Sequence, residues 1–283
     1  MIRKLLLILF LLPAFSFTLF SQLTVNSGLS GQELADILAG ENITATNVSV
    51  TGNSLQYGSF NFVGEGLDVN SGVILSTGSI LEAPGPNSSG STSTSFGGAG
   101  NELLTNLANS QTYDAVVLQF DFEVQSEKIE FNFNFLSEEY NEWVGSQFND
   151  VFAFFISGPG ISGEENLAVI PGTTTPVSIN TINNDSFWQF YHDNENGNTN
   201  VEFDGFTTLL TAQKDGLIPC ETYTLKLMIA DAGDGIYDAG VLLQENSLMQ
   251  ENISALTTTY SGTDVALEGC IEASFTFELE EAL

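Results

Sequence analysis

The chain has 283 residues and a formal charge of −31, because 36 acidic side chains stand against five Lys and Arg. Contacts to phosphate need clustered Lys and Arg, so this composition excludes nucleic acid as a partner. It also leaves most carboxylates without a cationic side chain. They must face solvent or share bound cations, and outside a cell the expected cation is calcium.

The first 21 residues have the parts of a secretory signal peptide. Arg3 and Lys4 precede an apolar run over residues 5–12, and a small residue, Ser21, ends the segment. Pro13 interrupts the apolar run before it is long enough to span a bilayer. The pattern predicts export, a secreted or cell-surface location, and no transmembrane segment in the mature chain.

One short helix is predicted near the start of the mature chain, at residues 30–40. Ser30 can cap it, Glu33 completes a capping box, and Gly40 can end it.

Most of the remaining chain alternates apolar and polar residues, which is the signal of β-strands. In 128–135 the apolar residues face one way, so one face is expected to meet a core and the other to meet water. Residues 151–156 are apolar on both faces and suit a central strand. We therefore predict an all-β, two-sheet β-sandwich, jelly-roll-like, with one short N-terminal helix. The predicted strands are 43–50, 58–63, 73–76, 115–124, 128–136, 151–157, 167–170, 201–203, 222–230 and 240–245.

Two segments depart from the strand pattern. Residues 84–100 are rich in Pro, Gly, Ser and Thr, cannot pack a core, and are predicted to form a long surface loop. The Thr-rich stretch at 254–261 is linker-like, and 273–279 looks like an opening strand of another module. We expect a β-sandwich domain over 22–253, followed at 254–283 by a linker and the start of an incomplete second β module.

Two groups of acidic residues are candidates for calcium. Asp231, Asp234 and Asp238 lie in a Gly-containing loop between two predicted strands, with a spacing that suits calcium loosely but is not an EF-hand. The alternative is a turn whose Asp side chains bond their own backbone. The second group is Glu138 and Glu139, followed by Asp150 at the entry to the next strand.

If the strands on either side of that second group pair, a cation there would relieve repulsion that no nearby Lys or Arg offsets. The alternative for both groups is a solvated acidic surface that keeps the protein soluble.

An aromatic cluster at 187–191 is the candidate recognition site. Trp188 and Tyr191, beside Asp185 and several Asn, are what a glycan or protein surface would need. Core packing of a non-alternating strand is the alternative.

Catalysis is not expected. Paired carboxylates would suit a glycosidase only at a fixed separation across a cleft, which a sequence does not reveal. His192 is the only histidine, no Gly-x-Ser-x-Gly motif marks a nucleophile, and His192 is expected to be an exposed loop residue. Cys220 and Cys270 are the only cysteines, too few with one histidine for a zinc site, and they are candidates for a disulfide.

Seven motifs follow one another within about residues 29–248. They are GVILSTG (72–78), FNFLSEEY (133–140), FNDVFAFFISGP (148–159), NLAVIPG (166–172), FDGFTTLLTA (203–212), PCETY (219–223) and GVLL (240–243). Together, and in this order, they resemble the choice-of-anchor L family. This resemblance implies a secreted or surface-displayed bacterial domain on chains with varied C-terminal sorting or anchoring signals, and no established catalytic activity; no such signal is recognised before Leu283.

Taken together, these features predict an extracellular or cell-surface binding or adhesion module, calcium-stabilised, without catalytic activity, whose partner is a glycan or a protein surface. Two alternatives stay open. One is a surface carbohydrate-active enzyme that uses paired carboxylates, and the other is a structural filler domain of a larger surface protein.

Overall fold

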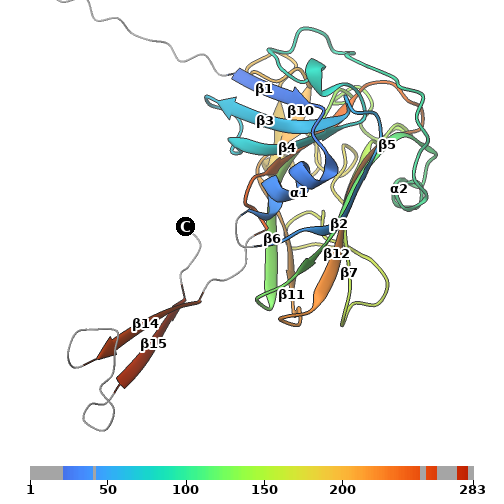
Figure 1. Ribbon diagram of the computed structural model, residues 1–283. Coiled ribbons are helices and arrows are strands. Elements are labelled where there is room, and N and C mark those ends of the chain that lie inside the picture. Colours follow the sequence, from blue (N-terminus) through green and yellow to red (C-terminus); the bar gives the residue numbers. More distant parts are fainter. Residues whose placement is uncertain (1–21, 41–42, 249–252, 260–272, 280–283) are drawn as a thin grey trace, which may run out of the picture.

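Two antiparallel sheets lie face to face and form a β-sandwich, seen in the ribbon of the computed structural model (Figure 1). The structure describes residues 22–40 and 43–248, and the backbone of two further strands at 253–259 and 273–279. The predicted fold class is confirmed. The predicted signal peptide lies outside the described residues.

The two sheets are built from alternating parts of the chain, as in jelly rolls. The eight-stranded sheet has the order β1-β3-β4-β13-β6-β10-β9, with β11 also pairing with β6, and the five-stranded sheet has the order β2-β5-β12-β7-β8. The first sheet contains β1 (Gln22–Ser27), β3 (Tyr57–Val63), β4 (Ser71–Ser76), β6 (Lys128–Ser137), β9 (Tyr191–Asp193), β10 (Gly205–Thr207), β11 (Leu210–Asp215) and β13 (Ala239–Gln244). The second contains β2 (Thr46–Thr51), β5 (Thr112–Glu123), β7 (Val151–Ser157), β8 (Glu165–Asn166) and β12 (Thr222–Ala232).

The main core fills the space between the sheets with aromatic side chains. Phe131 of β6 meets Phe154 of β7 edge to face, with ring centroids 4.7 Å apart, and Phe133 meets Phe152 at 5.2 Å. In the opposite sheet, Val116, Leu118, Phe120 and Phe122 of β5 are also buried. The period-2 pattern of these strands therefore identified the inner faces correctly.

The outer face of β6 differs from the prediction that it meets water. Asn134 is 1% exposed, and its Nδ2 donates to the carbonyl of Thr207 in β10, which pairs with β6 edge to edge, so the cover over this face comes from the chain behind the sheet. A second apolar cluster behind the sheet, which includes Leu136 and Phe206, explains the cover.

Helix α1 (Gly31–Ala39) confirms the predicted helix and lies against β2, β4 and β5, so it contacts both sheets. Helix α2 (Glu102–Ala108) was not predicted, and the expectation of a single helix is wrong. Its Leu104 packs on the outer face of the five-stranded sheet. Short 3-10 turns occur at η1 (Ile80–Glu82) and η2 (Trp188–Phe190).

Replacing the α1 cap is expected to weaken the domain measurably. The Ser30 Oγ accepts from the N–H of Glu33, and the Ser30 N–H donates to Glu33 Oε2 at 2.8 Å. Ser30→Ala removes the cap, and the free energy of unfolding in urea should fall by about 1 kcal/mol. Ser27→Ala, in β1, is the control for loss of a hydroxyl outside the helix. An unchanged urea midpoint for Ser30→Ala would contradict the assigned role.

Some strand predictions were wrong. β1 and β11 were not predicted, although β1 pairs with β3 over its whole length. Residues 167–170 and 201–203 were predicted as strands, but each forms only an isolated bridge, at Val169 and Val201. These segments gain their backbone partners from distant parts of the chain, which local alternation does not encode.

Two strands follow the sandwich domain in the sequence. β14 (Ile253–Thr259) pairs antiparallel with β15 (Ala273–Leu279). The Thr-rich stretch predicted as a linker is therefore largely a strand, while the strand expected at 273–279 is present.

Candidate functional site

Strand register brings three acidic residues together at one end of the eight-stranded sheet. Ser137, the last residue of β6, is paired with both Ala239 of β13 and Gly205 of β10. Glu138 follows Ser137, Asp238 precedes Ala239, and Asp204 precedes Gly205, so the three acids leave neighbouring strands at the same edge.

The five-stranded sheet contributes to the same end of the sandwich. Ala230 of β12 pairs with Val151 of β7, which places Asp231 beside Asp150. Glu139 connects the two sheets, because its Oε2 accepts from the backbone N–H of Asp150 at 3.3 Å. The strands β6 and β7 do not pair, contrary to one premise of the calcium prediction. They belong to opposite sheets, yet their ends still bring Glu139 and Asp150 together.

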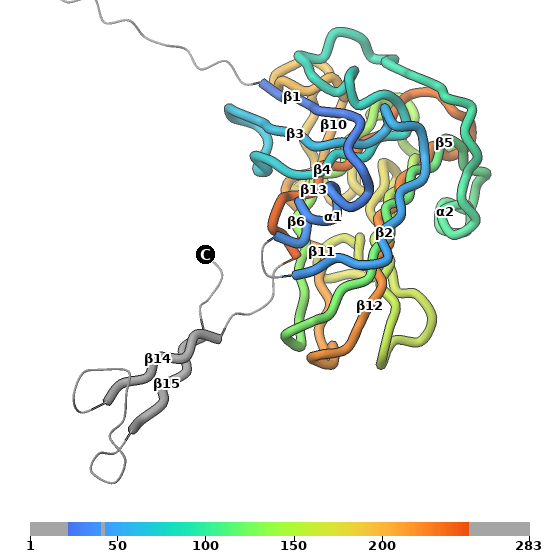
Figure 2. Tube along the Cα trace, viewed as in Figure 1, coloured from blue at the N-terminus to red at the C-terminus, as the bar shows by residue number. Residues whose placement is uncertain are grey.

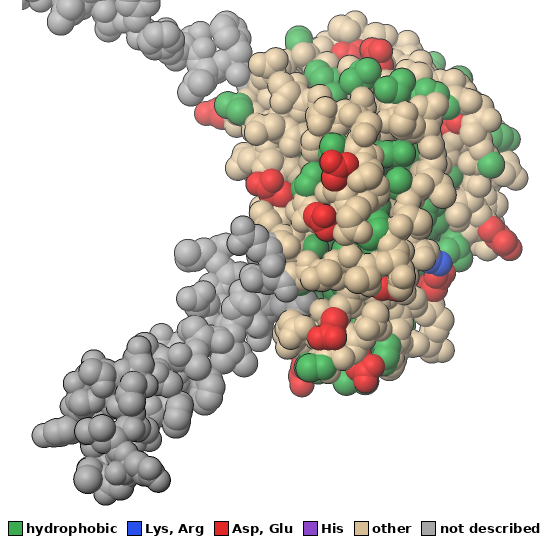
Figure 3. Space-filling view, viewed as in Figure 1, with side chains coloured by type: hydrophobic (Ala, Val, Ile, Leu, Met, Phe, Trp, Pro, Cys, Tyr) green, Lys and Arg blue, Asp and Glu red, His purple; other side chains and the backbone are tan. Residues whose placement is uncertain are grey.

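We call these six residues the carboxylate cluster. All are almost inaccessible to solvent, with between 0% and 4% of each residue exposed. The expectation of a solvated acidic surface does not hold for them, although acidic side chains are spread over the molecular surface elsewhere (Figure 3). The members of the cluster are Glu138, Glu139, Asp150, Asp204, Asp231 and Asp238.

Burial raises the pKa of every carboxyl in the cluster. Desolvation is the largest cause throughout, and repulsion from neighbouring carboxylates adds to it. The pKa of Glu138 rises to about 9 and that of Glu139 to about 8. The pKa values of Asp204 and Asp238 rise to about 6, and those of Asp150 and Asp231 lie well above their usual range.

Several oxygens of the cluster have no hydrogen-bond partner. They are both carboxylate oxygens of Glu138, Oδ2 of Asp150, Oδ2 of Asp204 and Oδ1 of Asp231. Buried polar atoms are normally paired, and an unpaired buried carboxylate costs several kcal/mol. These atoms therefore mark a place where the fold buries acidic groups without hydrogen-bond partners, a cost that a bound proton or a bound cation would reduce.

The lysines of the described chain lie far from the cluster. Lys128, Lys214 and Lys226 each form an ion pair, with Glu130, Glu165 and Glu164 respectively. Lys226 is the nearest along a strand, five residues before Asp231 in β12, or roughly 16 Å at about 3.3 Å per residue. At that distance Lys226 makes no ion pair with the cluster, and all three lysines pair with acids outside it.

The low-complexity segment 84–100 covers this end of the sandwich, where its teal trace runs above the sheets before reaching α2 (Figure 2). It was predicted as a long surface loop that cannot pack a core, and the structure adds that its donors bond to buried carboxylates. Oγ of Ser88 and Oγ1 of Thr92 donate to Glu202, both at 2.9 Å. The N–H of Thr94 donates to Asp238 at 2.9 Å.

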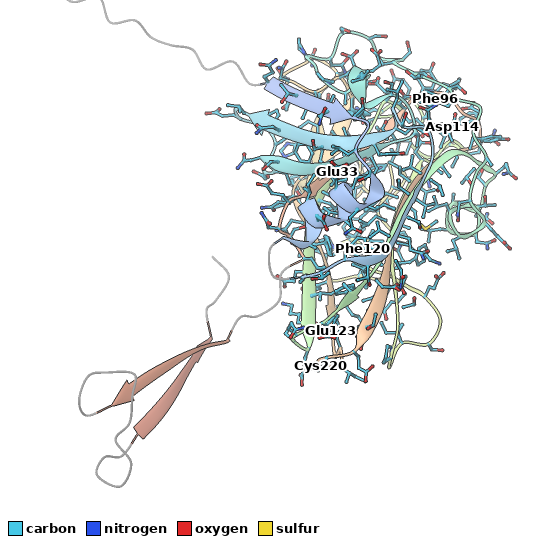
Figure 4. The ribbon with its side chains drawn as sticks, viewed as in Figure 1. Glu33, Phe96, Asp114, Phe120, Glu123 and Cys220 are labelled. Carbon is cyan, nitrogen blue, oxygen red and sulfur yellow. The ribbon has the colours of Figure 1, made fainter. Side chains whose placement is uncertain are left out.

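The same segment also holds Asp114, a further buried acid at the start of β5. The N–H of Phe96 donates to Asp114 Oδ2 at 3.2 Å, and the N–H of Gly98 donates to its Oδ1. Figure 4 shows Phe96 and Asp114 together at this end, while Glu123 and Cys220 lie at the opposite end.

Five of the six residues predicted as calcium ligands belong to the cluster. Asp234 does not: it is partly exposed in the turn between β12 and β13, where its Oδ1 accepts from the N–H of Ile236 at 3.2 Å, as the alternative of a self-bonding turn predicted. Sequence reasoning missed Asp204 and the nearby Asp114 and Glu202. Each stands apart from the acidic runs, so only strand pairing could have revealed them.

Calcium binding itself stays a prediction. Within the described residues, no three side chains of Asp, Glu, His or Cys are arranged to hold one metal ion as they stand. A cation here would need two carboxylates together with hydroxyl or carbonyl oxygens, which calcium accepts.

The aromatic cluster at 187–191 divides into an exposed and a buried part. Trp188 is 69% exposed and Phe187 is 38% exposed, whereas Tyr191 is buried against Tyr140, with ring centroids 4.7 Å apart. Phe187 has φ of 47°, a left-handed conformation that is rare for a bulky residue and costs on the order of 1 kcal/mol. Of the three residues predicted to bind a ligand, Trp188 and Asp185 face solvent and Tyr191 belongs to the core.

Polar side chains beside the exposed turn form a short chain of hydrogen bonds. Nδ2 of Asn184 donates to Asn141 at 2.8 Å, and Nδ2 of Asn141 donates to Glu195 at 2.9 Å. His192 is exposed as predicted, but it lies in strand β9 rather than in a loop and stacks near Phe206.

A pocket of about 400 Å³ lies elsewhere, between the 96–101 segment, the turn after β2 and strand β5. Asn53, Gln56 and Asn101 are its side-chain amides, and its lining includes no acidic, basic or thiol group. It offers amide hydrogen bonding but no nucleophile or acid–base pair.

Cys220 is exposed, and Cys270 lies outside the described residues, so their disulfide stays a prediction. No helix among the described residues has the length and hydropathy needed to cross a membrane.

Comparison with known proteins gives one match. No curated protein and no solved structure is significantly similar to the chain. The family model of the choice-of-anchor L domain matches residues 24–249, about four fifths of the chain and all of the sandwich except the first two residues of β1. The chain therefore belongs to the choice-of-anchor L domain family.

Proposed function

We propose that this protein is a non-catalytic carbohydrate-binding or adhesion module of the cell surface, stabilised by calcium, which recognises its partner through the exposed turn at Phe187 and Trp188. Membership of the choice-of-anchor L family indicates a surface-associated module. The observation that carries the recognition part is the exposure of Trp188, at 69% of its surface.

The position of these rings supports recognition of a ligand. Burying a Trp stabilises a fold, so a Trp held in solvent by a turn whose preceding residue is strained needs another reason to be there. The strain at Phe187 and the exposure of Trp188 occur at adjacent positions. Strained backbone and exposed aromatics are both concentrated at binding sites.

Carbohydrate is the partner whose chemistry fits best. The apolar faces of sugar rings stack on an indole, and their hydroxyl groups pair with planar amides and carboxylates. Asn184, Asp185 and Gln189 are exposed beside Trp188 and supply such groups. A protein surface is the other partner class, and the experiment below separates the two.

The alternative of a glycosidase has less support. Such an enzyme needs two carboxylates facing an open cleft. The clustered carboxylates of this domain are buried, and Asp238, Glu202 and Asp114 are hydrogen-bonded to the 84–100 segment. A purely structural filler domain would not need an exposed, strained aromatic turn.

Replacing the exposed Trp should abolish recognition without unfolding the domain. Trp188→Ala is expected to weaken retention on insoluble polysaccharides, or binding on a glycan array, by at least about tenfold, because buried Trp contacts dominate interfaces. The melting temperature should stay within about 1 °C, because Trp188 makes few contacts in the fold.

Ile218→Ala is the matched control, since Ile218 is 47% exposed and follows β11 at the opposite end of the sandwich. Equal loss of binding in both variants would contradict the assignment. Binding of a protein but no glycan, still dependent on Trp188, would replace carbohydrate by a protein partner. Release of reducing sugar from a bound polysaccharide would overturn the non-catalytic part of the proposal.

A further inference from the structure

Glu138 and Asp204 meet beneath the 84–100 segment with three oxygens that lack any hydrogen bond. Each residue is 1% exposed, both oxygens of Glu138 are unpaired, and so is Oδ2 of Asp204. The two carboxylates are close enough that Asp204 is the strongest charged influence on Glu138. No cationic side chain of the described residues reaches this place, since the three lysines pair with acids elsewhere.

The backbone around Gly90 and Thr92 lies directly over this site. A side-chain carbon at Gly90 would lie 3.3 Å from Oδ2 of Asp204, so the chain passes directly over the unpaired oxygen. The carbonyl of Thr92 accepts from the N–H of Asp238 at 3.2 Å, and the N–H of Thr92 lies close enough to the Glu138 carboxyl to lower its pKa, without the geometry of a hydrogen bond. Peptide and hydroxyl oxygens are thus available above the two carboxylates.

The remaining groups at the site are satisfied and hold the segment in place. Nδ2 of Asn87 donates to Oδ1 of Asp204 at 2.6 Å, which leaves Oδ2 as the free oxygen. Glu202 accepts from Ser88 and Thr92. The groups around Glu138 and Asp204 are therefore neutral or negative. The unpaired oxygens of these two residues are placed to accept a cation.

We propose that one calcium ion binds between Glu138 and Asp204, roofed by the 84–100 segment, which supplies further oxygen ligands. All donors at this site are oxygens, which favours a hard cation over zinc or copper. Calcium tolerates six to eight ligands of irregular geometry, including peptide carbonyls and hydroxyls, whereas magnesium demands a near-ideal octahedron and keeps its water. Two carboxylates balance the charge of one calcium ion.

This site gives the low-complexity segment a function. Without the ion, the carbonyl oxygens of the segment face two buried carboxyl groups and no cation. With the ion, those oxygens become ligands, and the segment is fixed against β6 and β10. Calcium should therefore order residues 86–95 more than the rest of the domain. The inference rests on the calcium part of the proposed function and gives that ion a place, whereas carbohydrate recognition at Trp188 can hold or fail independently of it.

The test is calcium titration of the whole chain after metal removal, by calorimetry and thermal unfolding. We expect one ion bound here with a dissociation constant of roughly 10⁻⁴ to 10⁻³ M, as in other extracellular modules, and a rise of several degrees in melting temperature at 10 mM calcium. Glu138→Gln and Asp204→Asn should each weaken binding at least tenfold. Asp215→Asn, an exposed carboxylate at the end of β11, is the control and should leave binding unchanged.

In chelator, a purely structural role for Glu138 predicts that Glu138→Gln melts at a lower temperature than the parent. A calcium-binding role predicts the reverse, because Gln keeps the shape of the side chain and removes the buried ionisable group, so the variant should melt at the same or a higher temperature than the parent. In calcium it should melt lower than the parent. Amide hydrogen exchange over 86–95 should slow at least tenfold with calcium in the parent and stay unchanged in Glu138→Gln.

Three results would overturn the proposal: no calcium binding, calcium binding that Glu138→Gln and Asp204→Asn leave intact, or equal effects of magnesium and calcium at equal concentration. Loss of glycan binding in Trp188→Ala with normal calcium binding would leave the proposal intact. If Asp204→Asn does not fold, calcium binding by Glu138→Gln and hydrogen exchange over 86–95 still test the proposal.

Discussion

In metal-free buffer, the free energy of unfolding is expected to fall as the pH rises from 5 to 8. Burial raises the pKa of Glu138 from 4.5 to about 9 and that of Glu139 to about 8. Between pH 4.5 and these values the folded protein keeps protons that the unfolded chain has released. Stability is therefore highest at the acidic side of this window and is lost as the pH rises through it.

The expected effect is large. At pH 7 the cost for Glu138 alone is on the order of 3 kcal/mol relative to pH 4.5, at about 1.4 kcal/mol per pH unit. Urea unfolding at pH 5, 6, 7 and 8 would measure it. Glu138→Gln should flatten the slope by about one proton, whereas the exposed Asp215→Asn should not. Metal-free stability that increases from pH 5 to 8 would contradict the buried, unpaired state of these carboxyls.

The second large effect concerns the aromatic core between the sheets. Phe154→Ala is expected to lower the free energy of unfolding by about 3 to 5 kcal/mol, because it removes a fully buried ring and leaves a cavity. Phe154 contacts Phe131 of the opposite sheet edge to face at 4.7 Å and 87°, a geometry that adds about 1 kcal/mol beyond burial.

Equilibrium urea unfolding of Phe154→Ala would measure this loss. An unchanged m-value would show that the variant is less stable and that the compactness of its native and unfolded states is unaltered. Val63→Ala is the matched control, since Val63 is a half-exposed residue at the end of β3 and should cost less than about 1 kcal/mol. A loss at Phe154 as small as at Val63 would mean that the two sheets are not held together by this layer.

The inner faces of the sandwich were predictable because burial alternates with a period of two. Phe131 and Phe133 of β6 were assigned to the core from sequence, and both are fully buried. The central strand at 151–156 was predictable for a related reason, since residues that are apolar on both faces need cover on both sides. Local signals also predicted α1, whose capping box involves only residues 30 and 33.

The elements that sequence did not predict depend on distant partners. Helix α2 has only seven residues, too few for a clear helical period, and it is stabilised by packing on β7 and β12. The outer face of β6 was expected to meet water, but Asn134 is buried and bonds to Thr207, and a second apolar cluster lies behind this end of the sheet. Neither contact has a signature within the segments themselves.

For the candidate site, sequence determined the excess of carboxylates, the scarcity of cations to pair with them and the local acidic runs. These follow from composition alone, and they suffice to predict that some acids need another source of positive charge. Tertiary structure decided which acids those are. Ser137 pairs with both Gly205 and Ala239, and this register brings Asp204 to Glu138, across 66 residues of chain, while the 84–100 segment seals both from water. Burial sets the pKa of a carboxyl and its need for a partner. It depends on the tertiary structure and cannot be predicted from any single segment.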